Sequence, residues 1–183
     1  MITFPPGTGG FLNPREIVES LEIIKEGMVI ADFGCGHGYF TIPLAKKVGE
    51  EGKVYALDVL PKALEAVKSR LKLENIQNVV PIRCNLEKEN GSTLEDELCD
   101  IVWIANLLFQ TEDDRAVVRE AKRVLKKDGY IVFIEWRVDV PFGPKGKRVA
   151  PEEAKKLFEE EGFLFEKTFS TDDYHYGMIF KKV

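Results

Sequence analysis

The chain has 183 residues and a formal net charge of −5, which suits one domain with a sizeable core and disfavours a protein that binds nucleic acid through a broad basic surface. No apolar run reaches the ~18 residues of a membrane span, and no secretory signal opens the chain. Three cysteines without metal-ligand spacing and only two histidines predict a cytoplasmic protein with reduced thiols and no metal site.

Residues 1–12 are too rich in proline and glycine for regular structure. They form either a frayed terminus or a flexible flap that closes over a ligand, with Phe4 and Phe11 as its apolar contacts. A helix should follow, capped by Asn13 and ended by Gly27.

Residues 28–48 predict a buried strand, a glycine turn and a helix. An apolar run leads into Asp32, three glycines follow at alternate positions, and apolar residues then recur every four positions. In such a turn Gly34 permits the sharp exit from the strand, and Gly36 lets a ligand approach the main chain. Gly38 should let the start of the helix pack against the strand.

The rest of the chain alternates strands and helices before the pattern changes near its end. Strands are expected at 54–58, 79–82, 100–105 and 130–136, with helices from Pro61 and from Asp113 or Asp114. This alternation predicts a parallel sheet covered on both faces. After a loop at 137–150 and a helix at 151–161, strands at 163–170 and 174–182 are joined by a link short enough only for an antiparallel pair. The predicted fold is therefore α/β, a doubly wound, seven-stranded, mostly parallel sheet with a C-terminal antiparallel hairpin, in one domain spanning 1–183.

The spacing of the glycines distinguishes between ligands. A dinucleotide fold requires G-x-G-x-x-G and a P-loop requires Gly-Lys-Ser/Thr, and neither is present. The pattern Asp-x-Gly-x-Gly-x-Gly resembles the first motif of the class I S-adenosylmethionine-dependent methyltransferases. An acid at that position suits this ligand, which carries an ammonium and a sulfonium but no phosphate.

Two polar residues follow the next strands, where ligands of open α/β sheets bind. Asp58 ends the second strand, where a carboxylate can accept both hydroxyls of a ribose; the alternative is a solvated strand-end acid. Asn85 follows the third strand, where its amide can pair with an adenine edge; the alternative is a turn residue.

The resemblance extends in order over residues 14–136 and implies a set of cofactor contacts. It includes segments similar to the family's second and third motifs, its fourth-strand motif and the turn before strand five. The implied cofactor is S-adenosylmethionine. Its methionine part, ribose and adenine would be held by Asp32, Gly34, Cys35, Gly36, Gly38, Asp58, Val59, Asn85, Leu86 and Asn106.

Two departures from the family pattern bear on the reaction. Most relatives have Asp in place of Asn85, and many small-molecule members have two histidines where Phe109 and Gln110 stand. Residues 106–109 also lack the Asn-Pro-Pro-aromatic motif of base-modifying members, which disfavours attack by an exocyclic base amine. Because in-line methyl transfer depends mostly on positioning, we assign no catalytic base.

The loop at 137–150 resembles the substrate-side insertion of small-molecule methyltransferases akin to quinone-biosynthesis enzymes, although it is equally interpreted as a solvated linker. Trp136 and Phe142 would form an apolar wall there, and Arg148 would meet an anion. The candidate substrate contacts are Phe11, Tyr39, Gln110, Glu135, Trp136 and Arg148. The predicted function is methyl transfer to a small molecule. The alternatives are an RNA or protein methyltransferase and a non-catalytic S-adenosylmethionine-binding module.

Overall fold

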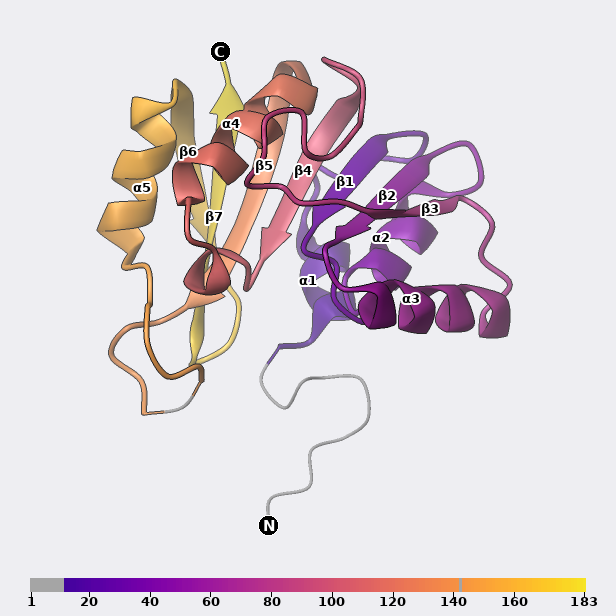
Figure 1. Cartoon of the computed structure of the whole chain (residues 1–183), viewed down its shortest axis with the longest axis horizontal. Coiled ribbons are helices and arrows are strands. Elements are labelled where there is room, and N and C mark those ends of the chain that lie inside the picture. The colour runs from indigo at the N-terminus through magenta and orange to yellow at the C-terminus, as the bar shows by residue number, and fades with distance from the viewer. Residues whose placement is uncertain (1–11, 142) are drawn as a thin grey trace.

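The computed structural model describes residues 12–141 and 143–183, so the expectations for Phe4, Phe11 and Phe142 lie outside the described residues. Helices and strands alternate along the chain (Figure 1). They are α1 Pro14–Ser20, β1 Val29–Phe33, α2 Thr41–Val48, β2 Lys53–Asp58, α3 Pro61–Leu73, β3 Val79–Arg83, β4 Cys99–Ala105, the 3-10 turn η1 Leu108–Gln110, α4 Asp114–Val124, β5 Leu125–Trp136, α5 Pro151–Glu160, β6 Phe163–Phe169 and β7 His175–Lys182. Within the two described ranges, no helix is both long and apolar enough to cross a bilayer.

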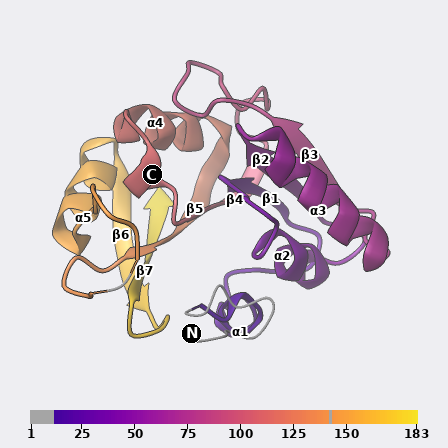
Figure 2. The same cartoon turned by 60° about the horizontal axis from the view of Figure 1, so that its bottom comes forward.

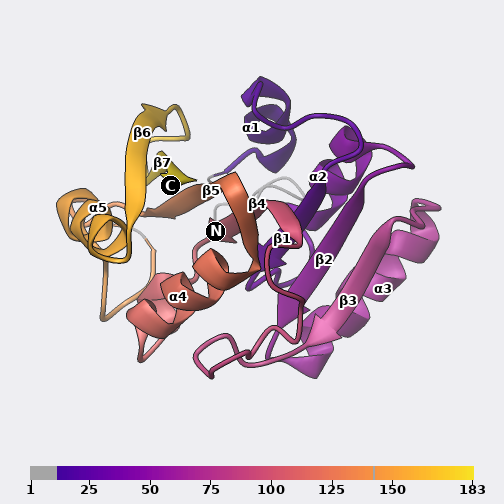
Figure 3. The same ribbon diagram turned by 90° about the horizontal axis from the view of Figure 1, so that it is seen from above.

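The strands form one seven-stranded sheet in the order β3-β2-β1-β4-β5-β7-β6 (Figure 3). The first five strands pair in parallel, and β7 is antiparallel to both β5 and β6. This arrangement confirms the predicted fold class, including the C-terminal hairpin. The strand order reverses between β1 and β4, and a crevice at the carboxyl ends of the strands is expected there.

Helices cover both faces of the sheet, with α1 and α2 on one side and α4 on the other (Figure 2). One buried cluster joins the sheet to α1, α2 and α3, and a second joins it to α4 and α5. Neighbouring residues of β1 divide between the clusters, with Ile30 in the first and Ala31 in the second, because successive side chains point to opposite faces. The strand is therefore apolar on both faces from Val29 to Ala31 rather than alternating, and Asp32 is its one polar side chain.

Most element boundaries lie within one residue of expectation, and two differ by several residues. Helix α1 ends at Ser20 instead of Gly27, because Leu21 takes an extended conformation at its C-cap. Ile24 is nevertheless buried, because the segment after α1 packs against the core without being helical. Strand β5 begins at Leu125, five residues earlier than expected, with a register shift against β4.

The irregular segment 87–98 is anchored to α4 by a buried polar network. The carboxylate of Glu120, only 4% exposed, accepts a hydrogen bond of 2.8 Å from the backbone amide of Ser92 and one of 2.7 Å from Arg123. The Arg123 guanidinium also donates to the Leu94 carbonyl and to Asp96. Hydrogen bonds from Arg123 and Ser92 overcome the burial of Glu120 and hold the pKa of its carboxyl below the ordinary value.

Candidate functional site

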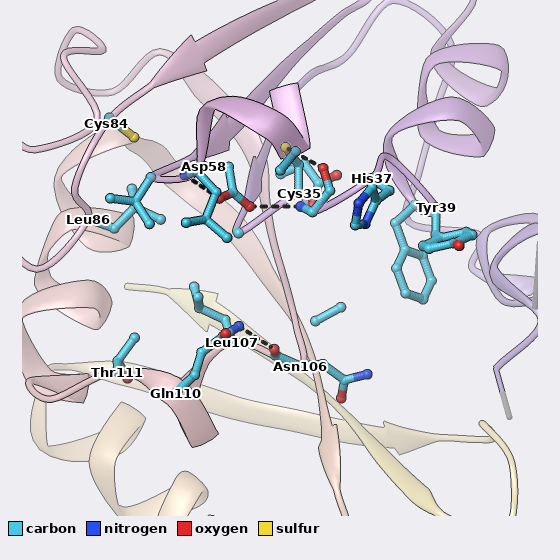
Figure 4. Close-up of a pocket in the computed structure, with 18 of the residues that line it drawn as sticks. Cys35, His37, Tyr39, Asp58, Cys84, Leu86, Asn106, Leu107, Gln110 and Thr111 are labelled. Atoms are coloured by element: carbon cyan, nitrogen blue, oxygen red, sulfur yellow. Dashed lines mark hydrogen bonds between the residues drawn. The ribbon is translucent and has the colours of Figure 1, made fainter. Parts of the chain in front are cut away.

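A cavity of about 470 Å³ lies at the carboxyl ends of the central strands. Figure 4 shows its labelled side chains in two rows, with Asp58, Cys35, His37 and Tyr39 on one side and Leu107, Asn106 and Gln110 on the other. Every predicted cofactor-binding residue except Gly38 lines it. That set is Asp32, Gly34, Cys35, Gly36, Asp58, Val59, Asn85, Leu86 and Asn106.

The turn after β1 is built as its glycines predict, with one difference. Gly34 has φ +71°, and a Cβ there would lie 2.8 Å from Leu107, so a side chain would push the two walls of the cavity apart. A Cβ on Gly36, at φ +52°, would meet no atom within 4 Å, which leaves the main chain open to a ligand. A Cβ on Gly38 would lie 3.1 Å from the Val67 side chain of α3, so this glycine allows close packing against α3 rather than against the strand.

Asp58 joins the end of β2 to the glycine turn. Its Oδ2 accepts a hydrogen bond of 2.9 Å from the Gly36 amide, and its Oδ1 accepts one of 2.8 Å from the Leu60 amide. The residue is buried at the edge of the cavity. Each carboxylate oxygen has a second lone pair, so the carboxylate can still accept hydroxyls while the two amides hold it in place.

Asp32 is the more deeply buried of the two cavity aspartates, with an exposed fraction of 2%. Its carboxylate accepts a hydrogen bond of 2.6 Å from the Thr41 hydroxyl. Burial raises its pKa to about 7, and nearby Asp58 adds to the rise, while the Thr41 hydrogen bond opposes it. A cationic group in the cavity would supply the countercharge that this carboxylate lacks.

The residues that follow β3 also line the cavity. The side-chain oxygen of Asn85 accepts from the backbone amide of Glu87 at 3.0 Å, which is the turn arrangement considered as its alternative role. Asn85 and Leu86 nevertheless both border the cavity, and the amide nitrogen of Asn85 is not used in that turn. The apolar side chains of Val59, Leu60 and Tyr39 are 53%, 61% and 42% exposed at the cavity edge, which favours a partly apolar ligand.

Asn106 follows β4 with φ +53°, a conformation that asparagine tolerates better than most residues. Its backbone amide donates to the Ile134 carbonyl, and its carbonyl accepts from the Gln110 side chain, as Figure 4 shows. Its side-chain nitrogen lies 3.2 Å from Nε2 of His175. Its side-chain oxygen is buried and has no hydrogen-bond partner among the described residues. An acceptor left in this state costs free energy until a donor is bound.

The predicted substrate residues separate into two groups. Tyr39 and Gln110 line the cavity, and the Arg70 guanidinium lies 5.4 Å from the centre of the Tyr39 ring. Phe11 lies outside the described residues. The remaining three, Glu135, Trp136 and Arg148, do not line the cavity.

Those three residues instead make structural contacts beside the cavity. Glu135 is fully buried and accepts backbone hydrogen bonds from Trp136 and Phe109, which fixes the 3-10 turn η1. Burial raises the pKa of Glu135 to about 7. The Trp136 ring packs on His175, with ring centres 4.0 Å apart.

The Arg148 guanidinium donates to backbone carbonyls of its own loop, those of Arg137, Val140 and Pro144. It thereby links both arms of the loop at 137–150. These contacts give Arg148 a role in shaping the loop, and none of them requires the anion suggested by the sequence.

None of the three thiols offers an activated nucleophile. Burial raises the pKa of Cys35 far above the ordinary thiol value, and raises those of Cys84 and Cys99 to about 12. Among residues 12–141 and 143–183, no cluster of three or more His, Cys, Asp or Glu side chains has the arrangement of a metal site. The cavity can bind and orient a ligand by hydrogen bonds, two buried carboxylates and apolar contacts.

Sequence reasoning missed several residues of the cavity and one behind it. Leu12, Pro14, Phe40, Leu60, Ala63, Cys84, Glu87, Ala105, Leu107 and Thr111 also line it. Leu60 and Ala63 had a readable signal, because they follow Asp58 at the start of α3. His175 had none, since 69 residues separate it from Asn106.

Comparison with known proteins identifies the family. The family model described as "Methyltransferase domain" matches residues 24–176. A demethylmenaquinone methyltransferase of Staphylococcus saprophyticus is 33% identical over 154 residues, which is 84% of this chain and 62% of that protein. One from Lactococcus lactis is 38% identical over 112 residues, 60% of this chain and 42% of that protein. In these alignments the chain spans about half the length of the curated relatives it matches.

Solved structures agree with this. A SAM-dependent methyltransferase from Aquifex aeolicus superposes with a TM-score of 0.82 at 26% identity, covering 98% of this chain and 94% of that one. A protein described as a putative type 11 methyltransferase, from Sulfolobus solfataricus, gives 0.69 at 29% identity, covering 85% and 84%. The resemblance seen in the motifs is thereby confirmed. The chain belongs to the methyltransferase-domain family, that of the class I S-adenosylmethionine-dependent methyltransferases.

Proposed function

We propose that this chain transfers a methyl group from S-adenosylmethionine to a small, flat and largely apolar acceptor, of the chemical class to which demethylmenaquinone belongs. The observation that carries the proposal is the convergence of Asp32, the glycine turn, Asp58, the Asn85–Leu86 pair and Asn106 on one cavity. The names of the relatives support the acceptor class.

The polar groups of the cavity match the cofactor part by part. The Asp32 carboxylate and the unpaired Asn106 oxygen suit the ammonium of the methionine part, because each is a buried acceptor without a cationic partner among the described residues. Asp58 suits the ribose hydroxyls, and Asn85 with the exposed Val59 suits an adenine ring. When bound, the cofactor supplies a methyl group activated by its sulfonium.

The chain's own contribution to the reaction is positioning. The glycine turn, tied to Asp58, holds one wall of the cavity, and the turn at 107–110, fixed by Glu135, holds the other. Two walls fixed in this way can align an acceptor with the methyl group, which provides a large part of the rate of an in-line transfer. The exposed apolar side chains of Tyr39, Val59 and Leu60 give a lipophilic acceptor a favourable surface at the entrance.

The test is methyl transfer from cofactor carrying a labelled methyl group. The acceptors offered in parallel are a short-chain demethylated naphthoquinol, a total RNA preparation and a protein extract. The proposal predicts label in the quinol product only. Label in RNA or protein would support the alternative acceptors, and cofactor binding without transfer to any fraction would support a binding module. Failure to bind either S-adenosylmethionine or its demethylated product would refute the function altogether.

A further inference from the structure

Behind the cavity wall, three polar side chains form a hydrogen-bonded chain that leads away from Asn106. The Asn106 side-chain nitrogen lies 3.2 Å from Nε2 of His175. The other ring nitrogen of His175, Nδ1, lies 2.8 Å from Oδ1 of Asp172. His175 is 3% exposed, and its ring packs against Trp136, so it has little freedom to turn.

The chemistry of the three groups determines which atom donates in each contact. A carboxylate only accepts, so Nδ1 of His175 carries the proton and donates to Asp172. Nε2 of the neutral ring is then an acceptor, and the Asn106 amide must turn its NH₂ group toward it. The buried amide oxygen of this cavity-lining residue is thereby left as an acceptor with no hydrogen-bond partner among the described residues.

We propose that His175, held by Asp172, is a positioning residue of the cofactor site: it fixes the side-chain amide of Asn106 so that its oxygen, and not its NH₂ group, is available to the ammonium of the bound ligand. This inference rests on the proposed function, because it assigns Asn106 to the methionine part of S-adenosylmethionine. With the amide reversed, two donors would face each other at the ammonium.

Protonation of His175 would reverse this arrangement. A protonated ring donates from both nitrogens, so Nε2–H would oppose the Asn106 NH₂ group, and the amide would rotate or lose its partner. Asp172 is the charged group in contact with the ring. The other neighbours that contact the ring, Trp136 at the end of β5 and Asn106 just after β4, are uncharged. Of the adjacent charged side chains on β5, Glu135 binds backbone amides, and the Arg137 that follows pairs with Asp139.

The first experiment is NMR of the histidine rings in the full chain. The sequence has two histidines, so comparison with His37→Gln assigns the two imidazoles. The titrations themselves use wild-type protein, because His37 lines the cavity. We expect His175 to be the Nδ1–H tautomer. Burial holds its pKa below the ordinary value in spite of Asp172. By linkage, addition of the demethylated cofactor should lower this pKa further, because the ligand favours the neutral ring. An Nε2–H tautomer would overturn the proposal.

The second experiment measures affinity for the demethylated cofactor between about pH 8 and about pH 5, where an ordinary histidine titrates. His175→Phe keeps a ring against Trp136 but removes the acceptor, and should weaken binding by about tenfold at the upper pH. His175→Gln retains an amide acceptor that does not titrate, so it should bind within about threefold of wild type there. The pKa of Asp32 lies in the same pH range, and its titration affects every variant alike. The quantity compared is therefore the affinity of His175→Gln divided by that of wild type. This ratio should rise as the pH falls.

The outcomes distinguish failure of the proposed function from failure of the positioning role alone. If wild-type protein binds neither the cofactor nor its product, the proposed function is wrong. If wild type binds and folded His175→Phe binds equally well, or the ratio stays flat with pH, the positioning role is wrong while the proposed function stands. Thermal unfolding of each variant shows whether a loss of affinity reflects a loss of folded protein.

Discussion

The carboxylate of Asp58, at the end of β2, accepts a 2.9 Å hydrogen bond from the backbone amide of Gly36 in the turn after β1. Two neighbouring parallel strands are thus tied together at the point where the cavity opens. The same carboxylate accepts from the Leu60 amide, so one side chain organises the start of α3 as well. A ligand that binds Asp58 therefore binds to a carboxylate that is already held in place.

Asp58→Asn should weaken binding of S-adenosylmethionine by about tenfold to a hundredfold. An amide has one acceptor atom, so its NH₂ group must face either the Gly36 or the Leu60 amide, and a hydroxyl acceptor is lost as well. Calorimetric titration measures the effect. Glu65→Gln, an exposed neutralisation on α3, is the matched control and should bind as wild type. Equal affinity of the two variants would remove Asp58 from the site.

Asp32→Asn should make the ligand-free protein more stable at pH 8 while it weakens cofactor binding. The folded-state pKa of Asp32 is about 7, above the ordinary 3.8, so between those values the unfolded chain has lost a proton that the folded protein keeps. Stability therefore falls as pH rises through this window and stays low above it. An amide does not ionise, and the gain at pH 8 should be on the order of 2–4 kcal/mol.

Urea unfolding at about pH 5 and about pH 8, where the difference should be smaller and larger respectively, measures that gain. Saturating cofactor should stabilise wild type much more than Asp32→Asn, because it binds the folded state and supplies the cation that the carboxylate lacks. A variant that is less stable than wild type at both pH values would contradict the assignment of Asp32 as a strained, functional carboxylate.

Arg123→Ala should destabilise the fold by about 3 kcal/mol, because it leaves the Glu120 carboxylate buried without its cation and frees the segment 87–98. Arg119→Ala on the same helix is the matched control. Its pairing with Glu161 is largely exposed, with 65% of the arginine side chain accessible, and its loss should cost less than about 1 kcal/mol.

The pH dependence of the Arg123 effect has a defined sign. The folded-state pKa of Glu120 lies below its ordinary value, so the stabilisation from this pair is present above the ordinary carboxyl pKa and is lost as the pH falls through the lower, folded-state value. Chemical denaturation over the acidic range should therefore show wild type and Arg123→Ala converging. A constant difference down to low pH would mean that Arg123 acts through packing alone.

Much of the fold and of one wall of the cavity could be predicted from the sequence, because their signals are local. The apolar run before Asp32, the alternating glycines and the acid ending β2 each indicate a structure from a few adjacent residues. The end of α1 could not be predicted, because Leu21 and Ile24 lie in the turn that follows the helix and are buried there. Buried positions are apolar in turns as well as in helices, so the sequence does not show where the helix ends.

The other side of the cavity depends on contacts between distant residues. The hydrogen bond between Asn106 and His175 brings together positions 69 apart, and no spacing rule identifies such a pair. Arg148 shows a related difficulty. Its charge suggested contact with an anion, whereas its guanidinium donates to the backbone carbonyls of Arg137, Val140 and Pro144. Every residue has a backbone carbonyl, so the sequence does not indicate which ones an arginine will contact.

The loop at 137–150 offers a test of whether its conformation matters for the acceptor. Gly143 has φ +102°, and a Cβ there would lie 2.5 Å from Cε3 of Trp136, so Gly143→Ala must displace either the loop or the indole ring. Gly146 has φ +109° and open space around it. Gly146→Ala therefore carries the same backbone cost, about 1–2 kcal/mol, without the overlap, and the difference between the two variants isolates the contact with Trp136.

On the prediction that the loop at 137–150 contacts the acceptor, Gly143→Ala should lower methyl transfer to the quinol by about tenfold or more relative to Gly146→Ala, because a displaced loop would misalign the acceptor. Both variants should bind the cofactor as wild type, since neither glycine lines the cavity. Tryptophan fluorescence reports the displacement directly: Trp103 is buried in the core, so a change in emission specific to Gly143→Ala arises from Trp136. If emission changes and transfer does not, the loop packs on Trp136 without taking part in acceptor binding, and residues 137–150 act as a linker between β5 and α5.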